Sequence, residues 1–532
     1  MLFNNRSTLM LMLAVLLLLV ACSNSTTNGT ANTSEEKNLF IGMVNPPIAF
    51  NTINSSDVAS QYIEGFMFDS LLDMPESLNF TPKLAESFDT TDNQTYTIKI
   101  NAKANWSDGT PVTAEDAAFT LNLIANPNVE THVGNFLTPL DGLDNGKLAE
   151  GVSEIPSVKV IDEKTLEFKT TKPVDPNMIK EQLGVKLMIL PKHILKDVDP
   201  KELSKHPFMQ NPTVINGPFK FVQYKKDQYV EFEKNLDYYL GTPKLDKIFV
   251  KIMPASNLVA QLQTGEIHMN NTLGKIAVQD YETVKKIENV KTELQQTIGF
   301  QLIVFNMETI KDAKLRQAIA YAINRESIVD DLLKGTGEII DGPYTSLNPY
   351  LNKNLTKYTY DPEKAKQLLA ESGWDINQTL DFVVPLGNKV REQSANIIVQ
   401  NLEDIGIKVK TATYDFPSSL QMAKEGDYDL YLLGNALTVD PDVSSMYASN
   451  GSFNFMNYNN PKVDQLLADG KAEPIAEKRK VIYDELQEIW EADLPVLTLY
   501  SDYNFAAISD SVSYGGVNIL DASVDYHLWD LE

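Results

Sequence analysis

Hydrophobic and polar positions recur along the chain with two different periods, which predict strands and helices in turn. Residues Thr95 to Ile100 alternate with a period of two, which is typical of a strand. Residues 60–72 place Tyr62, Phe66 and Leu72 at helical spacing. Because strands and helices are interleaved without a detectable repeat, the pattern favours α/β or α+β units in which crossover helices cover sheets.

The same reading extends over the rest of the chain. Thr113, followed by Glu115 and Asp116, predicts a helix from 113 to 126, because a hydroxyl cap and acidic residues stabilise a helix N-terminus. Further helices are predicted at 313–324, 327–333, 362–372, 390–404, 461–469 and 476–492. Strands are predicted at 39–44, 158–160, 165–170, 380–384, 408–412 and 428–433.

The first 22 residues read as a targeting signal. Arg6 precedes an unbroken apolar run from Leu9 to Val20, which is too short to span a bilayer, since about 20 residues are needed. The run ends in Leu-Val-Ala-Cys, which resembles the lipobox of bacterial lipoproteins. That resemblance implies cleavage after residue 21 and lipid attachment at Cys22. The alternative is an ordinary signal peptide followed by a chance cysteine.

Residues 22–37 are expected to form a flexible tether, because they contain no apolar side chain larger than Ala after the cysteine. No later segment resembles a transmembrane span. The expected mature chain has 532 − 21 = 511 residues. We predict that it is held at the outer face of the cytoplasmic membrane by its lipid anchor only.

Composition narrows the classes of partner. The chain has 72 acidic and 46 basic residues, a formal net charge of −26, which argues against binding to nucleic acid. Its length predicts two to four domains or lobes. It contains a single Cys, which excludes an intrachain disulfide and thiolate zinc sites.

Catalytic motifs are absent from the sequence. We find no phosphate-binding glycine loop, no Gly-x-Ser-x-Gly elbow and no His-Glu-x-x-His, and the five His residues are scattered. Pairs of carboxylates are too frequent in this chain to indicate a site. We therefore predict a protein that is not an enzyme and that has no metal or cofactor, with an exported glycosidase as a remote alternative.

One motif, from Trp106 to Asp116, is a turn followed by a helix cap, and with its surroundings it resembles a known family. The family is the oligopeptide- and dipeptide-binding proteins of ABC importers, solute-binding family 5. Further stretches follow in the family's order: Pro-Lys-Leu-Ala-Glu-Ser at 82–87, Asn-Gly-Pro-Phe at 216–219, Tyr-Tyr at 238–239 with Gly-Glu-Ile at 265–267, Phe-Asn at 305–306, residues 315–325, residues 361–369, and Tyr-Asp at 428–429 leading to Asp-Pro at 440–441.

The resemblance implies a two-lobe, periplasmic-binding-protein-like α/β fold of type II (cluster C) with an extra inserted domain. Lobe I would combine 38–77, 207–297 and 501–532, the inserted domain II would be 78–206, and lobe III would be 298–500. The chain would cross between the lobes twice, forming a hinge.

The resemblance also implies a function. Members of this family capture an extended peptide between two closing lobes, through hydrogen bonds to its backbone, and deliver it to the transmembrane subunits of an ABC permease. We expect a monomer whose ligand is an oligopeptide or another small molecule. A nickel chelate, an oligosaccharide or a signalling peptide on the same fold remains the alternative.

The sequence departs from the family where many members bind the peptide's α-ammonium group. The family's Trp is replaced by Asn435, the loop is one residue shorter, and no Asp occupies the expected place. Asp440 or Asp442 is the candidate replacement, and the alternative is that Asp440 and Pro441 only open a turn. A buried Asp facing the cleft is expected to meet a ligand cation or an Arg.

Other candidate ligand contacts follow from position in the family alignment. The lobe I segment that pairs with the ligand backbone would include Ser56, Asp57 and Val58, and the lobe III segment opposite would include Asn435, Ala436 and Leu437. Aromatic walls would come from Tyr344, Tyr414, Phe416 and Tyr500. For each of the four, a core or surface position is the alternative.

Overall fold

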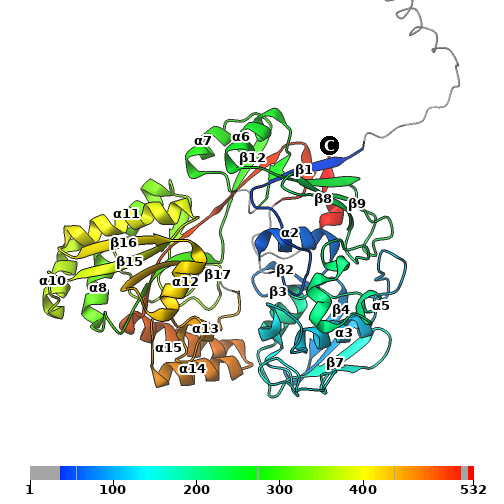
Figure 1. The fold of residues 1–532 in the computed structure, drawn as a ribbon, viewed down its shortest axis with the longest axis horizontal. Helices are drawn as coiled ribbons and strands as arrows, with labels where there is room; N and C mark the ends of the chain where they lie inside the picture. The colour runs from blue at the N-terminus through cyan, green and yellow to red at the C-terminus, as the bar shows by residue number, and fades with distance from the viewer. Residues whose placement is uncertain (1–35, 56, 272–274, 437, 517–524) are drawn as a thin grey trace, which may run out of the picture. The chain divides into compact units, whose positions relative to one another are not determined.

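The computed structural model describes residues 36–55, 57–271, 275–436, 438–516 and 525–532. The signal peptide, Cys22, most of the tether, Ser56 and Leu437 lie outside the described residues, so the predictions made for them stay predictions. Residues Lys37–Glu532 cluster into one compact unit. Three sheets with helices packed on them make up most of that unit (Figure 1).

A seven-stranded sheet collects strands from both ends of the described chain. Its order is β12-β19-β11-β1-β10-β9-β8, with β1 parallel to β10 and β11. The strands are β1 (Asn38–Met43), β8 (Phe219–Lys225), β9 (Tyr229–Lys234), β10 (Lys247–Ile252), β11 (Met269–Asn270), β12 (Val290–Gln295) and β19 (Asn504–Ser509).

A six-stranded sheet is formed entirely from one continuous part of the chain. Its order is β14-β18-β13-β17-β15-β16. The strands are β13 (Gly299–Phe305), β14 (Gly337–Ile339), β15 (Thr379–Pro385), β16 (Lys408–Tyr414), β17 (Leu430–Ala436) and β18 (Val496–Asp502). Helices α8 (Ala313–Ala322), α10 (Pro362–Ser372), α11 (Lys389–Asp404) and α12 (Phe416–Glu425) pack around it (Figure 1).

The four-stranded sheet, of order β4-β5-β7-β6, is formed by the part of the chain between β1 and β8 of the seven-stranded sheet. Its strands are β4 (Ala85–Thr90), β5 (Thr95–Ile100), β6 (Lys159–Val160) and β7 (Thr165–Lys169), and the hairpins β2 (Leu72–Glu76) with β3 (Asn79–Pro82) and β20 (Val512–Tyr514) with β21 (Asp530–Leu531) complete the list of paired strands. The other helices are α2 (Val58–Met67), α3 (Ala114–Ala125), α4 (Pro176–Ile179), α5 (Lys192–Leu195), α6 (Ala255–Thr264), α7 (Tyr281–Val284), α9 (Arg325–Ser327), α13 (Ser444–Tyr447), α14 (Pro461–Ala472) and α15 (Ala476–Asp493).

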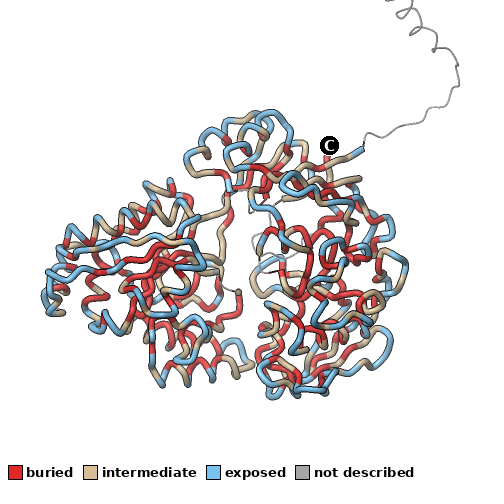
Figure 2. Tube along the Cα trace, viewed as in Figure 1, coloured by how far each residue is buried: buried red, intermediate tan, exposed pale blue. Residues whose placement is uncertain are grey.

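Apolar burial explains why these elements hold together. The inner strands β1, β13 and β18 are mostly buried, whereas the edge strand β16 and the outer faces of α10 and α11 are largely exposed (Figure 2). The strands of the seven-stranded sheet fall within the predicted lobe I and those of the four-stranded sheet within the predicted domain II, whereas β18 of the six-stranded sheet runs two residues past the predicted end of lobe III at residue 500. The domain boundaries themselves stay a prediction.

The chain passes between the seven-stranded and six-stranded sheets twice, at residues 296–298 and at Tyr503. The two passages are joined by side chains, because the Thr297 and Ser501 hydroxyls lie 3.1 Å apart and Ser501 donates to the Gly299 carbonyl at 2.6 Å. Two adjacent single-strand connections are the arrangement expected of a hinge.

Local predictions were mostly confirmed. The helix predicted from Thr113 is α3, in which Thr113 is the cap and Asp116 completes a capping box. The helix predicted at 60–72 was wrong at its C-terminal end, because α2 stops at Met67. Phe68 is extended there, and the Asp69 N–H donates to Asn216 Oδ1 at 2.9 Å, which leads the chain into β2.

Candidate functional site

Four strands of the six-stranded sheet end at one edge. β15 is parallel to β16 and β17, and β17 and β18 are both antiparallel to β13, so all four run in the same direction. Their last residues are Pro385, Tyr414, Ala436 and Asp502. In open α/β sheets ligands bind outside the carboxyl ends of such strands, which makes this edge the candidate site.

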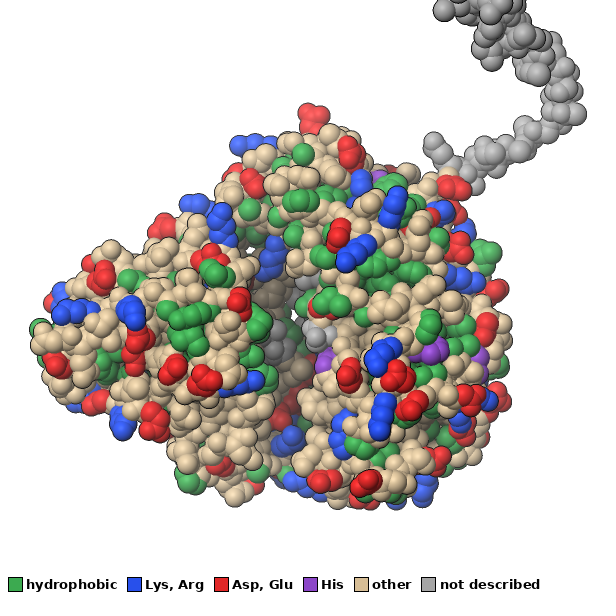
Figure 3. All heavy atoms as spheres, in the orientation of Figure 1, with side chains coloured by type: hydrophobic (Ala, Val, Ile, Leu, Met, Phe, Trp, Pro, Cys, Tyr) green, Lys and Arg blue, Asp and Glu red, His purple; other side chains and the backbone are tan. Residues whose placement is uncertain are grey.

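The surface is hollowed beside this part of the molecule. Figure 3 shows the hollow between the body that carries β15–β17 and the body that carries α2 and the four-stranded sheet. The two passages at residues 296–298 and Tyr503 connect the first of these bodies to the seven-stranded sheet.

Strand β17 has a free main-chain edge at the candidate site. On one side it pairs with β13 along its whole length, from Leu430 to Ala436. On the other side its register with β15 covers only Leu430 and Tyr431. Among the described residues, the last part of β17 therefore has no strand partner on that side, and its peptide groups there are open to an added strand.

Several residues predicted to contact the ligand lie at this edge. Asn435 is half-buried near the end of β17, and Ala436 is the last residue of that strand. Tyr414 ends β16 and is half-buried, while Phe416 starts α12 and is 48% exposed. Leu386 is exposed, and its N–H donates a hydrogen bond to the Tyr414 carbonyl at 2.8 Å, which holds it beside these residues. The edge therefore presents apolar side chains next to free peptide groups.

The predicted lobe I residues lie at the start of α2. Asp57 is the helix cap and accepts a hydrogen bond from the Ser60 N–H at 2.8 Å, and Val58 is exposed. Sequence reasoning missed Glu64 nearby, which is buried and accepts a hydrogen bond from Ser55 Oγ at 2.5 Å. Burial raises the pKa of Glu64 well above its usual value.

Tyr344 and Tyr500, by contrast, are core residues in this structure. Both side chains are buried; the Tyr344 hydroxyl donates to the Pro441 carbonyl at 2.6 Å, and the Tyr500 hydroxyl lies 3.2 Å from Ser394 Oγ. Neither ring provides exposed wall. The sequence left a core position open as the alternative for both residues, and both have a core position in this structure. A direct contact between either residue and the ligand stays a prediction.

Asp440 is already paired with a cation of the chain itself. It is 3% exposed, and Arg479, which is 0% exposed, donates to its two carboxylate oxygens at 2.6 and 3.2 Å. Arg479 also donates to Asp175 Oδ2 at 2.8 Å. The sequence-based expectation that a buried Asp here meets a cation therefore holds for an internal Arg, and a ligand amine would have to displace that Arg.

Asp442 also has partners within the chain. It forms an ion pair with Lys471 at 3.2 Å and accepts hydrogen bonds from the Ser444 N–H and hydroxyl. Burial opposes its ionisation, but Lys471 and Ser444 together hold its pKa below the usual value. Its predicted role in binding an amine stays untested.

A second acid of the inserted segment reaches the same loop. Glu181 is buried, and its carboxylate oxygens accept hydrogen bonds from the Val439 N–H at 2.9 Å and the Asp440 N–H at 2.8 Å. Burial raises the pKa of Glu181, against the effect of these hydrogen bonds. Asp175 and Glu181 thus fasten the part of the chain that carries the four-stranded sheet to the loop after β17.

Arg391 is a basic residue in contact with the unpaired part of β17. It lies in the first turn of α11, and its Nε donates to Gln301 Oε1 of β13 at 2.7 Å. A Cβ atom built on Gly434 would lie 2.4 Å from Arg391 Nη2. The guanidinium group therefore rests against the β17 backbone at a position where any larger residue would displace it. The one signal in the sequence was rarity, since the chain has only five Arg residues.

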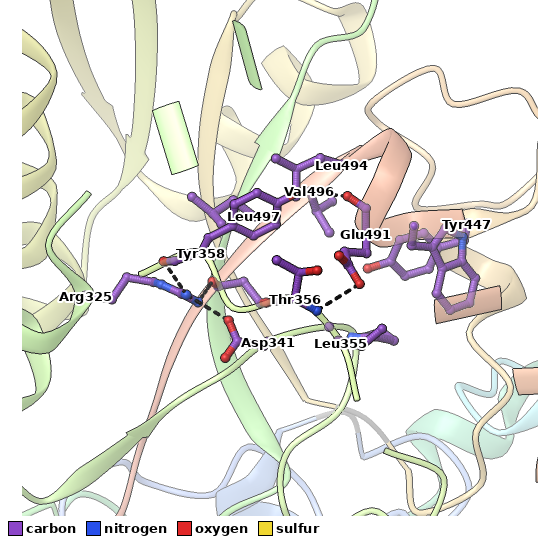
Figure 4. A pocket seen from close by; sticks show the side chains of 14 residues that line it. Arg325, Asp341, Leu355, Thr356, Tyr358, Tyr447, Glu491, Leu494, Val496 and Leu497 are labelled. Carbon is purple, nitrogen blue, oxygen red and sulfur yellow. Dashed lines mark hydrogen bonds and ion pairs between the residues drawn. The ribbon is translucent and has the colours of Figure 1, made fainter. Parts of the chain in front are cut away.

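A small cavity lies elsewhere, lined in part by residues of β18. It encloses about 30 Å³ and is lined by side chains that include Arg325, Asp341, Tyr358 and Trp490 (Figure 4). Arg325 donates to Asp341 at 2.8 Å and to the Tyr358 carbonyl at 2.8 Å, so its charge is compensated internally. A space of this size holds about one water and no peptide residue.

Two further features bear on the site. Within the described ranges, no group of three or more His, Cys, Asp and Glu residues is arranged to hold a metal ion. In the same part of the chain, none of the helices combines the length and the apolar character needed to cross a membrane.

Comparison with known families gives one match to most of the chain. Residues 79–457 match the family described as bacterial extracellular solute-binding proteins, family 5.

Individual relatives agree with that match. The oligopeptide-binding protein AppA of Bacillus subtilis is 32% identical over 520 residues, which cover 92% of each chain. The structure of that protein in complex with a nonapeptide matches with a TM-score of 0.78 and 29% identity, covering 93% of this chain and 99% of that one. Heme-binding protein A of Haemophilus influenzae is 27% identical over 522 residues, 92% of each chain.

Proposed function

Because the chain belongs to family 5 of the bacterial extracellular solute-binding proteins, we propose that it captures an extended peptide at the free edge of β17 and delivers it to an ABC permease. The predicted family and its two-lobe α/β fold are confirmed by these matches. The members to which the chain is similar are binding proteins and not enzymes.

The observation that carries the peptide proposal is the unpaired part of β17. Its peptide groups lie at the carboxyl edge of the sheet, beside the hollow seen in Figure 3. An extended ligand can complete the hydrogen bonding there whatever its side chains are, because the bonds are made by the two main chains. The similarity to a protein solved with a nonapeptide supports a ligand of this kind.

The apolar rim supports the same ligand. Leu386 and Phe416 are exposed and Tyr414 is half-buried where the strands end. Apolar surface next to free peptide groups favours a chain with mixed side chains over a fully polar oligosaccharide. Closure about the passages at residues 296–298 and Tyr503 would enclose the ligand.

Anchoring and delivery form the rest of the proposal. The Leu-Val-Ala-Cys sequence supports lipid attachment at Cys22, and the polar stretch that follows supports a tether between the lipid and the folded unit. A monomer held in this way would present its ligand to the transmembrane subunits of the permease.

The test uses the full chain and isothermal titration calorimetry with a mixed peptide library, followed by single peptides from the bound fraction. A bound peptide is then N-methylated at every second amide in one frame, and at the remaining amides in the other. An added strand directs alternate N–H groups toward its partner, so one frame should abolish binding and the other should weaken it much less.

Two results would contradict the proposal. If no peptide in the library binds, the ligand is not a peptide. If a peptide binds equally well in both methylated frames, it does not pair as a strand with β17.

A further inference from the structure

The four arginines in the described part of the chain differ in how their guanidinium groups are satisfied. Arg316 donates five hydrogen bonds to backbone carbonyls, and Arg325 and Arg479 each bind carboxylates as well as carbonyls. Arg391 makes one side-chain hydrogen bond, from Nε to Gln301. Within the described residues, its two terminal nitrogens have no hydrogen-bond or carboxylate partner.

The unsatisfied nitrogens are held in a defined place. Gln301 is buried in β13 and fixes the Nε side of the group, while the bare backbone of Gly434 admits Nη2 on the other side. Both contacts lie on strands that pair with each other, since Gln301 and Gly434 are directly opposite in the ladder between β13 and β17. The guanidinium group is therefore held on the face of the sheet, against the part of β17 that has no partner strand on its other side.

The positive charge of this group is not neutralised nearby. Arg391 is half-buried, and loss of hydration lowers its pKa, although an arginine stays charged at any physiological pH. Asp502 is one of the acids that oppose this lowering, and it already forms an ion pair with Lys275 at 3.1 Å. Glu392 accepts a hydrogen bond from the Gly387 N–H at 2.9 Å. A half-buried charge without a partner costs free energy that an anion in the site would recover.

We infer that Arg391, oriented by Gln301 and Gly434, is a carboxylate-binding residue that selects ligands with a carboxylate beside the strand-pairing backbone. The inference rests on the proposed function, because it places this group next to a peptide paired with β17. A guanidinium group with its two terminal nitrogens free matches the two oxygens of a carboxylate. A phosphate dianion would leave charge uncompensated, since this site offers one cation.

A peptide carboxylate has two sources, the C-terminus and an acidic side chain. The experiment compares four matched libraries on the full chain: free acid or C-terminal amide, each with or without Asp and Glu. Arg391→Gln should weaken binding of carboxylate-bearing peptides by about 10- to 100-fold and leave peptides without any carboxylate unchanged. The library that loses affinity identifies the source of the carboxylate.

Two variants serve as controls. Arg391→Lys keeps the charge but not the paired nitrogens, and it should retain part of the preference. Lys389→Gln removes an exposed charge two residues earlier in the same helix and should bind all libraries as the parent chain does. If Arg391→Gln and Lys389→Gln behave alike, or if Arg391→Gln weakens all libraries equally, the inference is wrong.

A second probe keeps the inference separate from the peptide proposal. N-acetylglycine and N-acetylglycinamide differ only in the carboxylate, and thermal unfolding is followed with each at equal ionic strength. The carboxylate should stabilise the parent chain and not Arg391→Gln, even if no peptide in the libraries binds. Equal effects of the two compounds on the parent chain, together with no loss of peptide affinity in Arg391→Gln, would overturn the inference.

Discussion

Arg479 and Arg391 both belong to the part of the chain that forms the six-stranded sheet and its helices, but their surroundings are opposite. Arg479 is fully buried, bound to Asp175 and Asp440, and flanked by the rings of Tyr350 and Tyr483. Arg391 is half-buried and has one amide partner. The first arginine completes a structure whose partners are all in the chain. The terminal nitrogens of the second have no hydrogen-bond partner among the residues that the structure describes.

The comparison also separates two uses of acidic residues. Asp175 and Glu181 lie between β7 and β8 in the sequence. Asp175 accepts a hydrogen bond from Arg479, and Glu181 accepts hydrogen bonds from the Val439 and Asp440 N–H groups. Negative charge is thus concentrated around Arg479 and is absent from direct contact with Arg391 among the described residues. The acidic composition of the chain therefore gives no guide to the sign of the charge that a ligand meets at β17.

The largest effect should come from removing the buried cation. Arg479→Met leaves Asp175 and Asp440 buried without their partner, which should lower the free energy of unfolding by about 3–5 kcal/mol. Denaturation by urea measures this change. Arg391→Gln should stay within about 0.5 kcal/mol of the parent chain, because the Arg391 side chain is only half-buried and forms no ion pair with any described residue.

The matched control for this variant is Lys478→Met, which removes an exposed charge one position earlier in α15. It should have little effect on unfolding. If Arg479→Met and Lys478→Met have similar stability, the buried cluster does not hold the structure together and the contrast between the two arginines fails.

A smaller effect should come from the glycine beside Arg391. Gly434→Ala places a methyl group 2.4 Å from the present position of Nη2, so the guanidinium group must move. Carboxylate-bearing peptides should then bind about tenfold more weakly, since a hydrogen bond to a charged group contributes about 1.5–3 kcal/mol. Calorimetry with free-acid and amidated peptides measures the difference.

The fold should tolerate this change, because the backbone of Gly434 is not in the left-handed region and the clash is with the end of a flexible side chain. Unchanged affinity for the free-acid peptides would show that the position of Arg391 against β17 does not matter for binding.

The smallest effect should be on the pH dependence of stability. Burial raises the pKa of Glu181 in the folded chain. From about pH 4.5 upward, the unfolded chain has lost this proton while the folded chain still binds it, so the free energy of unfolding falls as the pH rises through the raised pKa. Glu181→Gln cannot titrate and should lose this part of the slope.

Urea denaturation at several pH values from about pH 4.5 to pH 8 measures the slope in the two chains. Arg391→Gln should keep the parent slope, since no carboxylate is bound to it. Parallel curves for the parent chain and Glu181→Gln would show that Glu181 has the same pKa in the folded and the unfolded chain.

Much of the fold could be predicted from local pattern. Helix α10 has the predicted bounds, and β5 is the predicted strand. Both could be predicted because the signals that define them, such as a helix-capping residue or the spacing of apolar side chains, lie within or next to the element itself. The end of α2 was missed because it depends on Asn216, nearly 150 residues further along the chain. The family and its fold followed from motifs spread over most of the length.

The candidate site could be predicted only in part. The β17 segment followed from alignment, but the partner of Asp440 did not, since Arg479 is 39 residues away and Asp175 is 304 residues from Arg479. Arg391 was missed for the same reason, because Gln301 is 90 positions before it. Periodicity reports which face of an element is buried; it does not report which distant charge meets it there.

The seven-stranded sheet can be completed only at the end of synthesis, because it contains the late strand β19. This strand lies between β12 and β11 and is the last of the seven to leave the ribosome. Until it is made, β12 has no neighbour in its sheet, although β1 and β10 can already pair. Strand β18, which the six-stranded sheet needs between β14 and β13, is separated from β19 by Tyr503 alone, so the last strand of each large sheet is made at almost the same time. The two sheets are therefore completed together, at the end of synthesis.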